Sequence, residues 1–96
     1  MSSSDMLGLA GKVALVWGGG YGMGERTSLR LAEAGAHVAV IDLERERAEA
    51  VAGQIVAGGG TAVALQADAM DEASVVAATD AAEAALSKID RVGLIP

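Results

Sequence analysis

Apolar and polar positions along this chain form two kinds of block, which are short continuous apolar runs and longer segments with apolar residues at helical spacing. Four short apolar runs have the length and continuity of buried strands, at residues 12–17, 36–41, 61–67 and 91–95. Three longer segments between them carry apolar residues at helical spacing, at residues 22–34, 44–57 and 72–87. The pattern therefore predicts strands and helices in strict alternation, with a strand at either end.

Each predicted helix has one apolar stripe that is expected to face a sheet. The stripes comprise, in chain order, Met23, Thr27, Leu31 and Ala34, then Ala48, Val51, Ala52 and Ile55, then Val75, Thr79, Ala82 and Leu86. Gly35 follows the first helix where a positive φ is favoured, and Asp71 is suited to cap the third helix. Such alternation is typical of a parallel sheet covered by helices, and right-handed crossovers limit its topologies to a few.

Composition narrows the class of protein. The chain has 96 residues, enough for one small domain, and with 2% aromatic residues its core is expected to consist of Val, Leu, Ile and Ala. The net charge of -6 and the lack of a basic cluster argue against nucleic-acid binding. No cysteine is present, and no apolar stretch is long enough to span a bilayer. We therefore expect a cytoplasmic protein that binds neither nucleic acid nor membrane.

A glycine cluster follows the first predicted strand, in the stretch KVALVWGGGYGMG. Gly18, Gly22 and Gly24 stand at the turn between this strand and the first helix. The unpaired N–H groups and the dipole of the helix face such a loop, and the lack of side chains lets a pyrophosphate approach the backbone. The alternative is a turn that needs glycine only for its dihedral angles.

Asp42 ends the second predicted strand, eighteen residues after Gly24. A carboxylate at this place can accept hydrogen bonds from ribose hydroxyls, and it favours NAD over NADP because a 2′-phosphate would face a negative charge. The alternative is a cap for the next helix, and the two roles can be combined. Arg45 and Arg47 weaken the argument for NAD over NADP, since either side chain could swing toward a phosphate. Arginines on a helix surface are, however, more often solvated.

The assembled pattern resembles the short-chain dehydrogenase/reductase family. The stretches that carry the resemblance are GKVALVWGGGYGMG, LAEAGAHVAVIDL and ADAMD at 67–71, and the resemblance extends from about Leu9 to Asp90. It implies a Rossmann-like α/β fold of three layers, here with a partial four-stranded parallel sheet in the order 3-2-1-4. The first two helices are expected on one face of the sheet and the third on the other.

The resemblance also implies a cofactor site. The site comprises Gly18, Gly20, Tyr21, Gly22, Met23, Gly24, Asp42, Leu43, Asp68 and Ala69. By resemblance the glycines line the pyrophosphate, Asp42 holds the adenosine ribose, and Asp68 contacts the adenine amino group with help from the N–H of Ala69. Leu43 stands where an arginine often marks a preference for NADP, which supports NAD. Asp68 has an alternative role as an Asx residue that orders its own loop.

Two departures from the family pattern stand out. Trp17 replaces the threonine that usually precedes the first loop glycine, and we expect it to be a core residue at the strand end. The alternative is that its indole crowds the cofactor cleft. The second departure concerns catalysis, because the family's Asn-Asn-Ala-Gly stretch, catalytic Ser and Tyr-x-x-x-Lys pair are absent from these 96 residues.

No other residue is expected to supply the missing chemistry. The single tyrosine, Tyr21, has Glu25 rather than lysine four positions later. Ser28 lies on a predicted helix with no base beside it, and His37 stands alone on a strand, so neither a catalytic nor a metal site is expected. The interpretation is a flexible segment, residues 1–10, followed by a truncated NAD-binding Rossmann domain, residues 11–96.

Two functions follow from this interpretation. The first is the NAD(H)-binding part of a short-chain dehydrogenase/reductase, whose parent activity would be hydride transfer between NAD(H) and an alcohol or carbonyl compound. The second is a catalytically inactive module that acts through self-association or a partner. An open fourth strand and a sheet face covered by one helix would favour association, including a homo-oligomer formed through the sheet edge.

Overall fold

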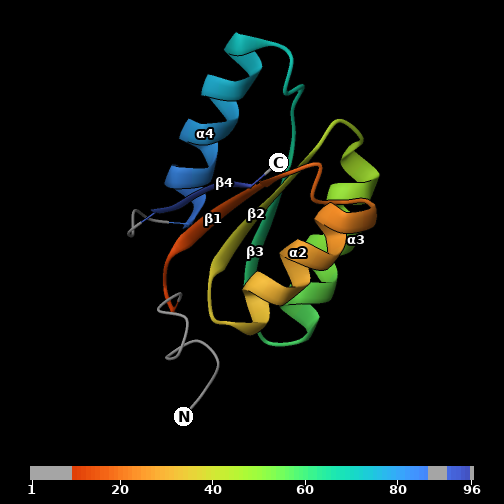
Figure 1. Cartoon of the computed structure of the whole chain (residues 1–96), viewed down its shortest axis with the longest axis vertical. Coiled ribbons are helices and arrows are strands. Elements are labelled where there is room, and N and C mark those ends of the chain that lie inside the picture. Colours follow the sequence, from red (N-terminus) through yellow and green to blue (C-terminus); the bar gives the residue numbers. More distant parts are fainter. Residues whose placement is uncertain (1–9, 87–90, 96) are drawn as a thin grey trace.

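The computed structural model describes residues 10–86 and 91–95, in which strands and helices alternate as predicted (Figure 1). The elements are β1 (Val13–Trp17), α2 (Gly22–Glu33), β2 (His37–Asp42), α3 (Arg45–Ala57), β3 (Thr61–Gln66), α4 (Glu72–Leu86) and β4 (Arg91–Ile95). Wherever a predicted boundary falls in the described part of the chain, it lies within about one residue of the observed one. Most of the predicted flexible segment 1–10 and the predicted helix end at Ser87 lie outside the described residues.

The strands form one parallel sheet in the order β3-β2-β1-β4, which is the predicted order. β1 pairs with β2 from Val13 opposite His37 to Trp17 opposite Ile41. Because β2 and β3 lie on one side of β1 and β4 lies on the other, the strand order reverses at β1. In open sheets of this kind, ligands bind outside the carboxyl ends of the strands at such a reversal.

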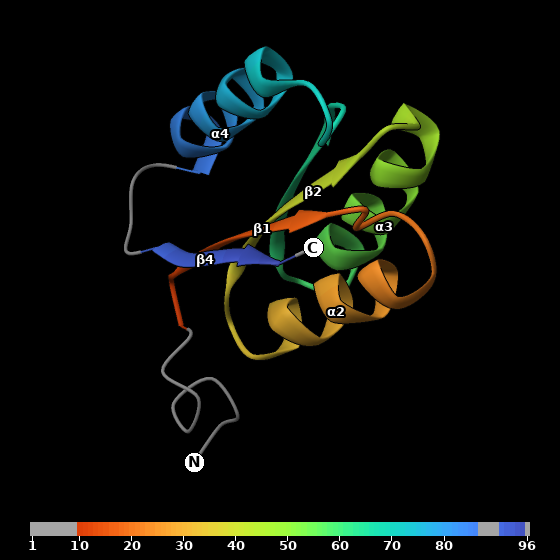
Figure 2. The ribbon, with the colours of Figure 1, turned by 45° about the horizontal axis from the view of Figure 1, so that its top comes forward.

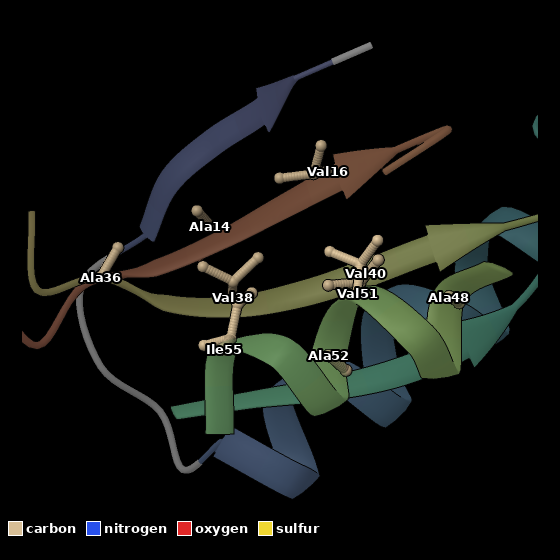
Figure 3. Close-up of a cluster of buried hydrophobic side chains, with 9 residues drawn as sticks. All are labelled: Ala14, Val16, Ala36, Val38, Val40, Ala48, Val51, Ala52 and Ile55. Carbon is tan, nitrogen blue, oxygen red and sulfur yellow. The ribbon is translucent and has the colours of Figure 1, made fainter. Parts of the chain in front are cut away.

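The two faces of the sheet pack against different helices (Figure 2). On the face covered by α2 and α3, the buried cluster comprises Ala14, Val16, Ala36, Val38, Val40, Ala48, Val51, Ala52 and Ile55 (Figure 3). On the face covered by α4, it comprises Val13, Leu15, Ala39, Ile41, Ala67, Ala78, Ala82 and Leu86. Side chains alternate along a strand, so successive residues of β1 serve opposite faces. The predicted division of the helices, two on one face and one on the other, is confirmed.

The predicted apolar stripe is confirmed for α3 but is wrong in part for α2. All four predicted positions of α3 are buried, and Ala82 and Leu86 are buried in α4. In α2, however, Met23 is 83% exposed, and the fully buried side chain is Ser28. Apolar periodicity cannot detect this inward position, because a hydroxyl fills it and forms hydrogen bonds there.

Candidate functional site

The loop between β1 and α2 folds against the end of β2. The N–H groups of Gly18 and Gly19 both donate to the carbonyl oxygen of Ile41, at 2.7 and 3.0 Å. A second contact comes from α2, where the buried Ser28 Oγ lies 2.9 Å from the carbonyl oxygen of Gly24 and 3.3 Å from that of Gly19. One hydroxyl proton serves these two acceptors. The chain's own contacts therefore fix the shape of the loop.

Three of the loop glycines are required by close backbone contacts. A Cβ on Gly19 would lie 2.8 Å from the carbonyl oxygen of Val16. A Cβ on Gly24 would overlap the carbonyl oxygen of Gly18, and a Cβ on Gly20 would lie 2.5 Å from the backbone carbon of Arg47. Beside Gly18 and Gly22, by contrast, no atom outside the adjoining chain lies within 4 Å of where a Cβ would be, and both have a positive φ, of 73° and 55°, as the dihedral alternative requires. Packing thus accounts for part of the glycine pattern without a ligand, and a binding site has to be recognised from what surrounds the loop.

Asp42, at the end of β2, connects the glycine loop to the start of α3. Its Oδ2 accepts the N–H of Gly20 at 3.1 Å, and its Oδ1 accepts the N–H of Glu44 at 3.0 Å. The side chain is buried, with 7% of its surface exposed. The capping alternative is therefore present in the structure, in the form of the bond to Glu44. Each carboxylate oxygen has a second lone pair, so these bonds leave acceptor capacity for a ligand.

Asp68 follows β3 and is held within its own loop. Its Oδ1 accepts the N–H of Met70 at 2.9 Å, and its N–H donates to Ser74 Oγ at 2.9 Å. The side chain is exposed, and the bond to Met70 is the Asx contact foreseen as its alternative role. Nearby, Asp71 Oδ1 accepts the N–H of Ala73 at 3.1 Å, which confirms Asp71 as the cap of α4.

Residues at or just after the ends of β1, β2 and β3 border one cavity of about 340 Å³. Its lining comprises Trp17, Gly18, Tyr21, Asp42, Leu43, Arg47, Ala67, Asp68 and Ala69. Six of the ten predicted site residues meet here, and the other four, Gly20, Gly22, Met23 and Gly24, do not line it. A larger hollow of about 450 Å³ beside Met23 runs along α2 and includes none of these strand-end residues. The smaller cavity is therefore the candidate site.

Residues 12–93 match the family model of the short chain dehydrogenases. The chain belongs to the short-chain dehydrogenase family. The 7alpha-hydroxysteroid dehydrogenase of Escherichia coli is 38% identical over 90 residues, which are 94% of this chain and 35% of that protein. The 2,5-dichloro-2,5-cyclohexadiene-1,4-diol dehydrogenase of Sphingobium indicum is 47% identical over 66 residues, which are 69% of this chain and 26% of that protein.

A solved structure in the same family is also similar. It is a 7 alpha-hydroxysteroid dehydrogenase complexed with NADH and 7-oxo glycochenodeoxycholic acid, with a TM-score of 0.82 and 36% sequence identity. The match covers 85% of this chain and 32% of that one. The chain thus spans between about a quarter and about a third of the length of these relatives.

Trp17 contributes to both the core and the cavity of this chain. The half-buried indole packs against the buried cluster on the α4 face and also lines the cavity. Its Nε1 is buried and, in the described part of the chain, has no hydrogen-bond partner. The expected core role of Trp17 is supported by this packing, whereas crowding of a cofactor by the indole stays a prediction. The loop-ordering function of a hydroxyl side chain, which Trp17 cannot supply, falls to Ser28 from α2.

Two further contributions to the site are missing from the predicted set. Ser28 was placed only on a helix, although a serine four residues after Gly24 was the available signal. Arg47 was weighed only as a residue that could swing toward a phosphate. In the structure its guanidinium already lies 4.4 Å from the centroid of the Tyr21 ring, at the border of the cavity. No sequence signal indicates this contact, because Tyr21 lies in the glycine loop and Arg47 in α3.

Other kinds of site find no support in residues 10–86 and 91–95. Within these ranges, no group of three or more His, Cys, Asp or Glu side chains is placed to hold a metal ion. His37 is half-buried at the start of β2. None of the described helices is long and apolar enough to cross a membrane.

Proposed function

We propose that this chain is the cofactor-binding part of a short-chain dehydrogenase and that its cavity takes the adenosine end of NAD(H). The observation that carries the proposal is the convergence on one cavity of Gly18, Asp42 and Asp68, which lie at or just after the ends of three different strands. A loop glycine, a fixed carboxylate and a second acidic residue are the groups that an adenine dinucleotide requires at a strand-order reversal. The similar 7 alpha-hydroxysteroid dehydrogenase with NADH bound supports this choice of cofactor.

The residues present fit such a cofactor. Open space beside Gly18, where no atom outside the adjoining chain lies within 4 Å of a Cβ position, lets a phosphate group approach the loop, while the N–H of Gly18 itself donates to Ile41. Asp42 is held in place by two backbone N–H groups and retains acceptor capacity for ribose hydroxyls. When bound, NAD supplies a nicotinamide ring that accepts or donates a hydride. This chain's residues would bind and orient the adenosine end of the cofactor.

We further propose that NAD is preferred to NADP. The Asp42 carboxylate borders the cavity, and a phosphate on the ribose would be brought close to its negative charge. Leu43, which also lines the cavity, adds no positive charge to offset this repulsion. Tighter binding of NADP than of NAD would contradict the role given to Asp42.

The activity of the whole protein is proposed to be hydride transfer between NAD(H) and an alcohol or carbonyl compound. The 96 residues contain neither the catalytic Ser nor the Tyr-x-x-x-Lys pair that the family resemblance calls for. Without an acid/base pair to move the hydroxyl proton, we expect no turnover by this chain alone. A dehydrogenase assay that gave turnover with this chain would contradict that expectation.

Calorimetric titration of the intact chain with NAD, NADP and ADP-ribose tests the proposed binding. We expect NAD and ADP-ribose to bind with similar affinity, because the chain would hold only the adenosine end. Trp17 is the only tryptophan and lines the cavity, so its fluorescence gives a second readout. Asp80→Asn, on the exposed side of α4, is the control for Asp42→Asn. A folded sample that binds none of the three ligands would overturn the proposal.

Self-association stays a prediction. β4 lies at one edge of the sheet and β3 at the other, and strand edges of this kind can pair with another chain. Light scattering over a wide range of protein concentrations tests it, and a monomer throughout would count against it.

A further inference from the structure

Arg47 is held at the border of the cavity by contacts with three other residues. Its guanidinium lies 4.4 Å from the centroid of the Tyr21 ring, a cation–π contact between α3 and the glycine loop. Its Nη2 lies 3.6 Å from Glu44 Oε2. Its backbone packs so closely on Gly20 that no Cβ would fit there. The side chain remains 45% exposed, so its donors are accessible to a ligand.

The negative charge of Asp42 and the positive charge of Arg47 have different surroundings at this part of the cavity. Asp42 is buried, and the N–H groups of Gly20 and Glu44 fix the position of its carboxylate. Arg47 supplies the positive charge in the lining, and the carboxylate of Glu44 lies beside it. A phosphate near Asp42 would therefore be repelled by a fixed carboxylate and attracted by an arginine that Glu44 partly neutralises.

We propose that Arg47 sets how far this site tolerates a phosphate on the adenosine ribose, and that Glu44 limits the tolerance by competing for the guanidinium. The inference rests on the proposed function, because it concerns the same cavity. A guanidinium presents its donors in a planar fork that matches the oxygens of a phosphate. Tyr21 keeps the guanidinium beside the cavity, and Glu44 pairs with one of its nitrogen atoms, Nη2. The preference for NAD thus depends on Glu44 as well as on Asp42.

The chain offers a matched control on the same helix. Arg45 and Glu49 form an ion pair of the same length, 3.6 Å, with similar exposure, and neither residue lines the cavity. Neutralising Arg45 changes the net charge by the same amount as neutralising Arg47, and neutralising Glu49 by the same amount as neutralising Glu44. A difference between the two pairs of variants therefore reports the position of the charge rather than the charge of the whole protein.

The experiment compares AMP with adenosine 2′,5′-bisphosphate, two ligands that differ by the 2′-phosphate alone. Both are titrated into the intact chain and into the variants Arg47→Gln, Glu44→Gln, Arg45→Gln and Glu49→Gln, each checked for folding by circular dichroism. Arg47→Lys is added because it keeps the charge but removes the planar fork. Parallel titrations with NAD and NADP extend the result to the whole cofactor.

We expect Arg47→Gln to weaken binding of the bisphosphate about tenfold, the size of one charge-assisted phosphate contact, while AMP affinity changes less than about twofold. Glu44→Gln should strengthen bisphosphate binding about threefold, and Arg47→Lys should fall between wild type and Arg47→Gln. The Arg45 and Glu49 variants should change both affinities by less than about twofold.

Two results would overturn the inference. One is an unchanged ratio of bisphosphate to AMP affinity in Arg47→Gln and Glu44→Gln. The other is an equal loss of both ligands in Arg47→Gln, which would indicate that Arg47 acts only through the shape of the loop. Either result, with AMP and NAD bound by the wild-type chain, would leave the proposed function standing. Failure of the wild-type chain to bind AMP and NAD would instead overturn the proposed function and this inference with it.

Discussion

Asp42 and Asp68 border the same cavity, yet the structure holds them in different ways. The buried Asp42 carboxylate joins two connections, because it accepts N–H groups from Gly20 before α2 and Glu44 before α3. The exposed Asp68 carboxylate accepts the N–H of Met70, two residues along its own loop. A change at Asp42 should therefore alter the shape of the site, whereas a change at Asp68 should act locally.

The difference extends to the surroundings of the two residues. On the Asp42 side, the loop is fixed by a buried hydroxyl, that of Ser28, and by backbone contact between Gly20 and α3. On the Asp68 side, the corresponding hydroxyl, that of Ser74, forms an exposed hydrogen bond. Buried polar contacts are costly to break because their partners cannot turn to water instead. The same kind of substitution should thus have a larger effect on the Asp42 side.

Among the substitutions that compare the Asp42 and Asp68 sides, Gly20→Ala should have the largest effect on stability. The new Cβ would lie 2.5 Å from the backbone carbon of Arg47, so the loop would have to move away from α3, at a cost of about 3 kcal/mol in the free energy of unfolding. Gly53→Ala is the control, since nothing lies within 4 Å of its Cβ position in the middle of α3. That change should stabilise the chain by about 0.5–1 kcal/mol. Urea unfolding followed by circular dichroism measures both, and equal effects would contradict the prediction.

Asp42→Asn tests directly whether the Asp42 carboxylate is held more firmly than that of Asp68. An asparagine offers one oxygen in place of two, so its amide group would face the N–H of Gly20 or of Glu44. We expect a loss of about 2 kcal/mol in the free energy of unfolding, together with a loss of NAD binding. Asp68→Asn keeps an oxygen for Met70 and should change stability by less than about 0.5 kcal/mol. Equal destabilisation by the two substitutions would show that the carboxylates are held alike.

Ser28→Ala and Ser74→Ala form a second matched pair. Removal of the buried Ser28 hydroxyl leaves the carbonyl oxygen of Gly19 without this donor and should destabilise the chain by about 1–1.5 kcal/mol. Ser74 accepts the N–H of Asp68 at an exposed site, where water can replace it, so its removal should cost about 0.5 kcal/mol or less. If Ser74→Ala lowered the free energy of unfolding more than Ser28→Ala in the same urea assay, the prediction that the buried hydroxyl contributes more would be wrong.

Trp17→Phe should have the smallest effect. The substitution removes some apolar contact with the α4-side cluster, but it also removes a buried N–H that has no partner in the described residues. These terms oppose each other, so the free energy of unfolding should change by less than about 0.5 kcal/mol. A loss of several kcal/mol in circular-dichroism melts would mean that the indole N–H takes part in a contact that the protein needs.

The sequence by itself determined the order of the elements and their approximate bounds, whereas the division of the helices between the two faces was expected from the family resemblance. The order and the bounds follow from local period and local chemistry, as at Asp71, whose capping bond to Ala73 spans two residues. Reasoning from the residues placed Gly18 and Asp42 at one end of the sheet, because the carboxyl ends of parallel strands meet there, and the family resemblance added Asp68.

Only the tertiary structure decided how these residues are held. It turned the polar Ser28 inward, gave the Asp42 carboxylate two donors from different connections, and laid Arg47 over the ring of Tyr21. The Ser28 contact with Gly24 lies within α2, where the spacing of four residues was a signal. The two bonds of Asp42 taken together, and the contact of Arg47 with Tyr21, join parts of the chain that no period or spacing within one element relates. They arise only when the parallel sheet brings separate loops together at one edge, and for that reason the restraint on Arg47 could not be derived from the sequence.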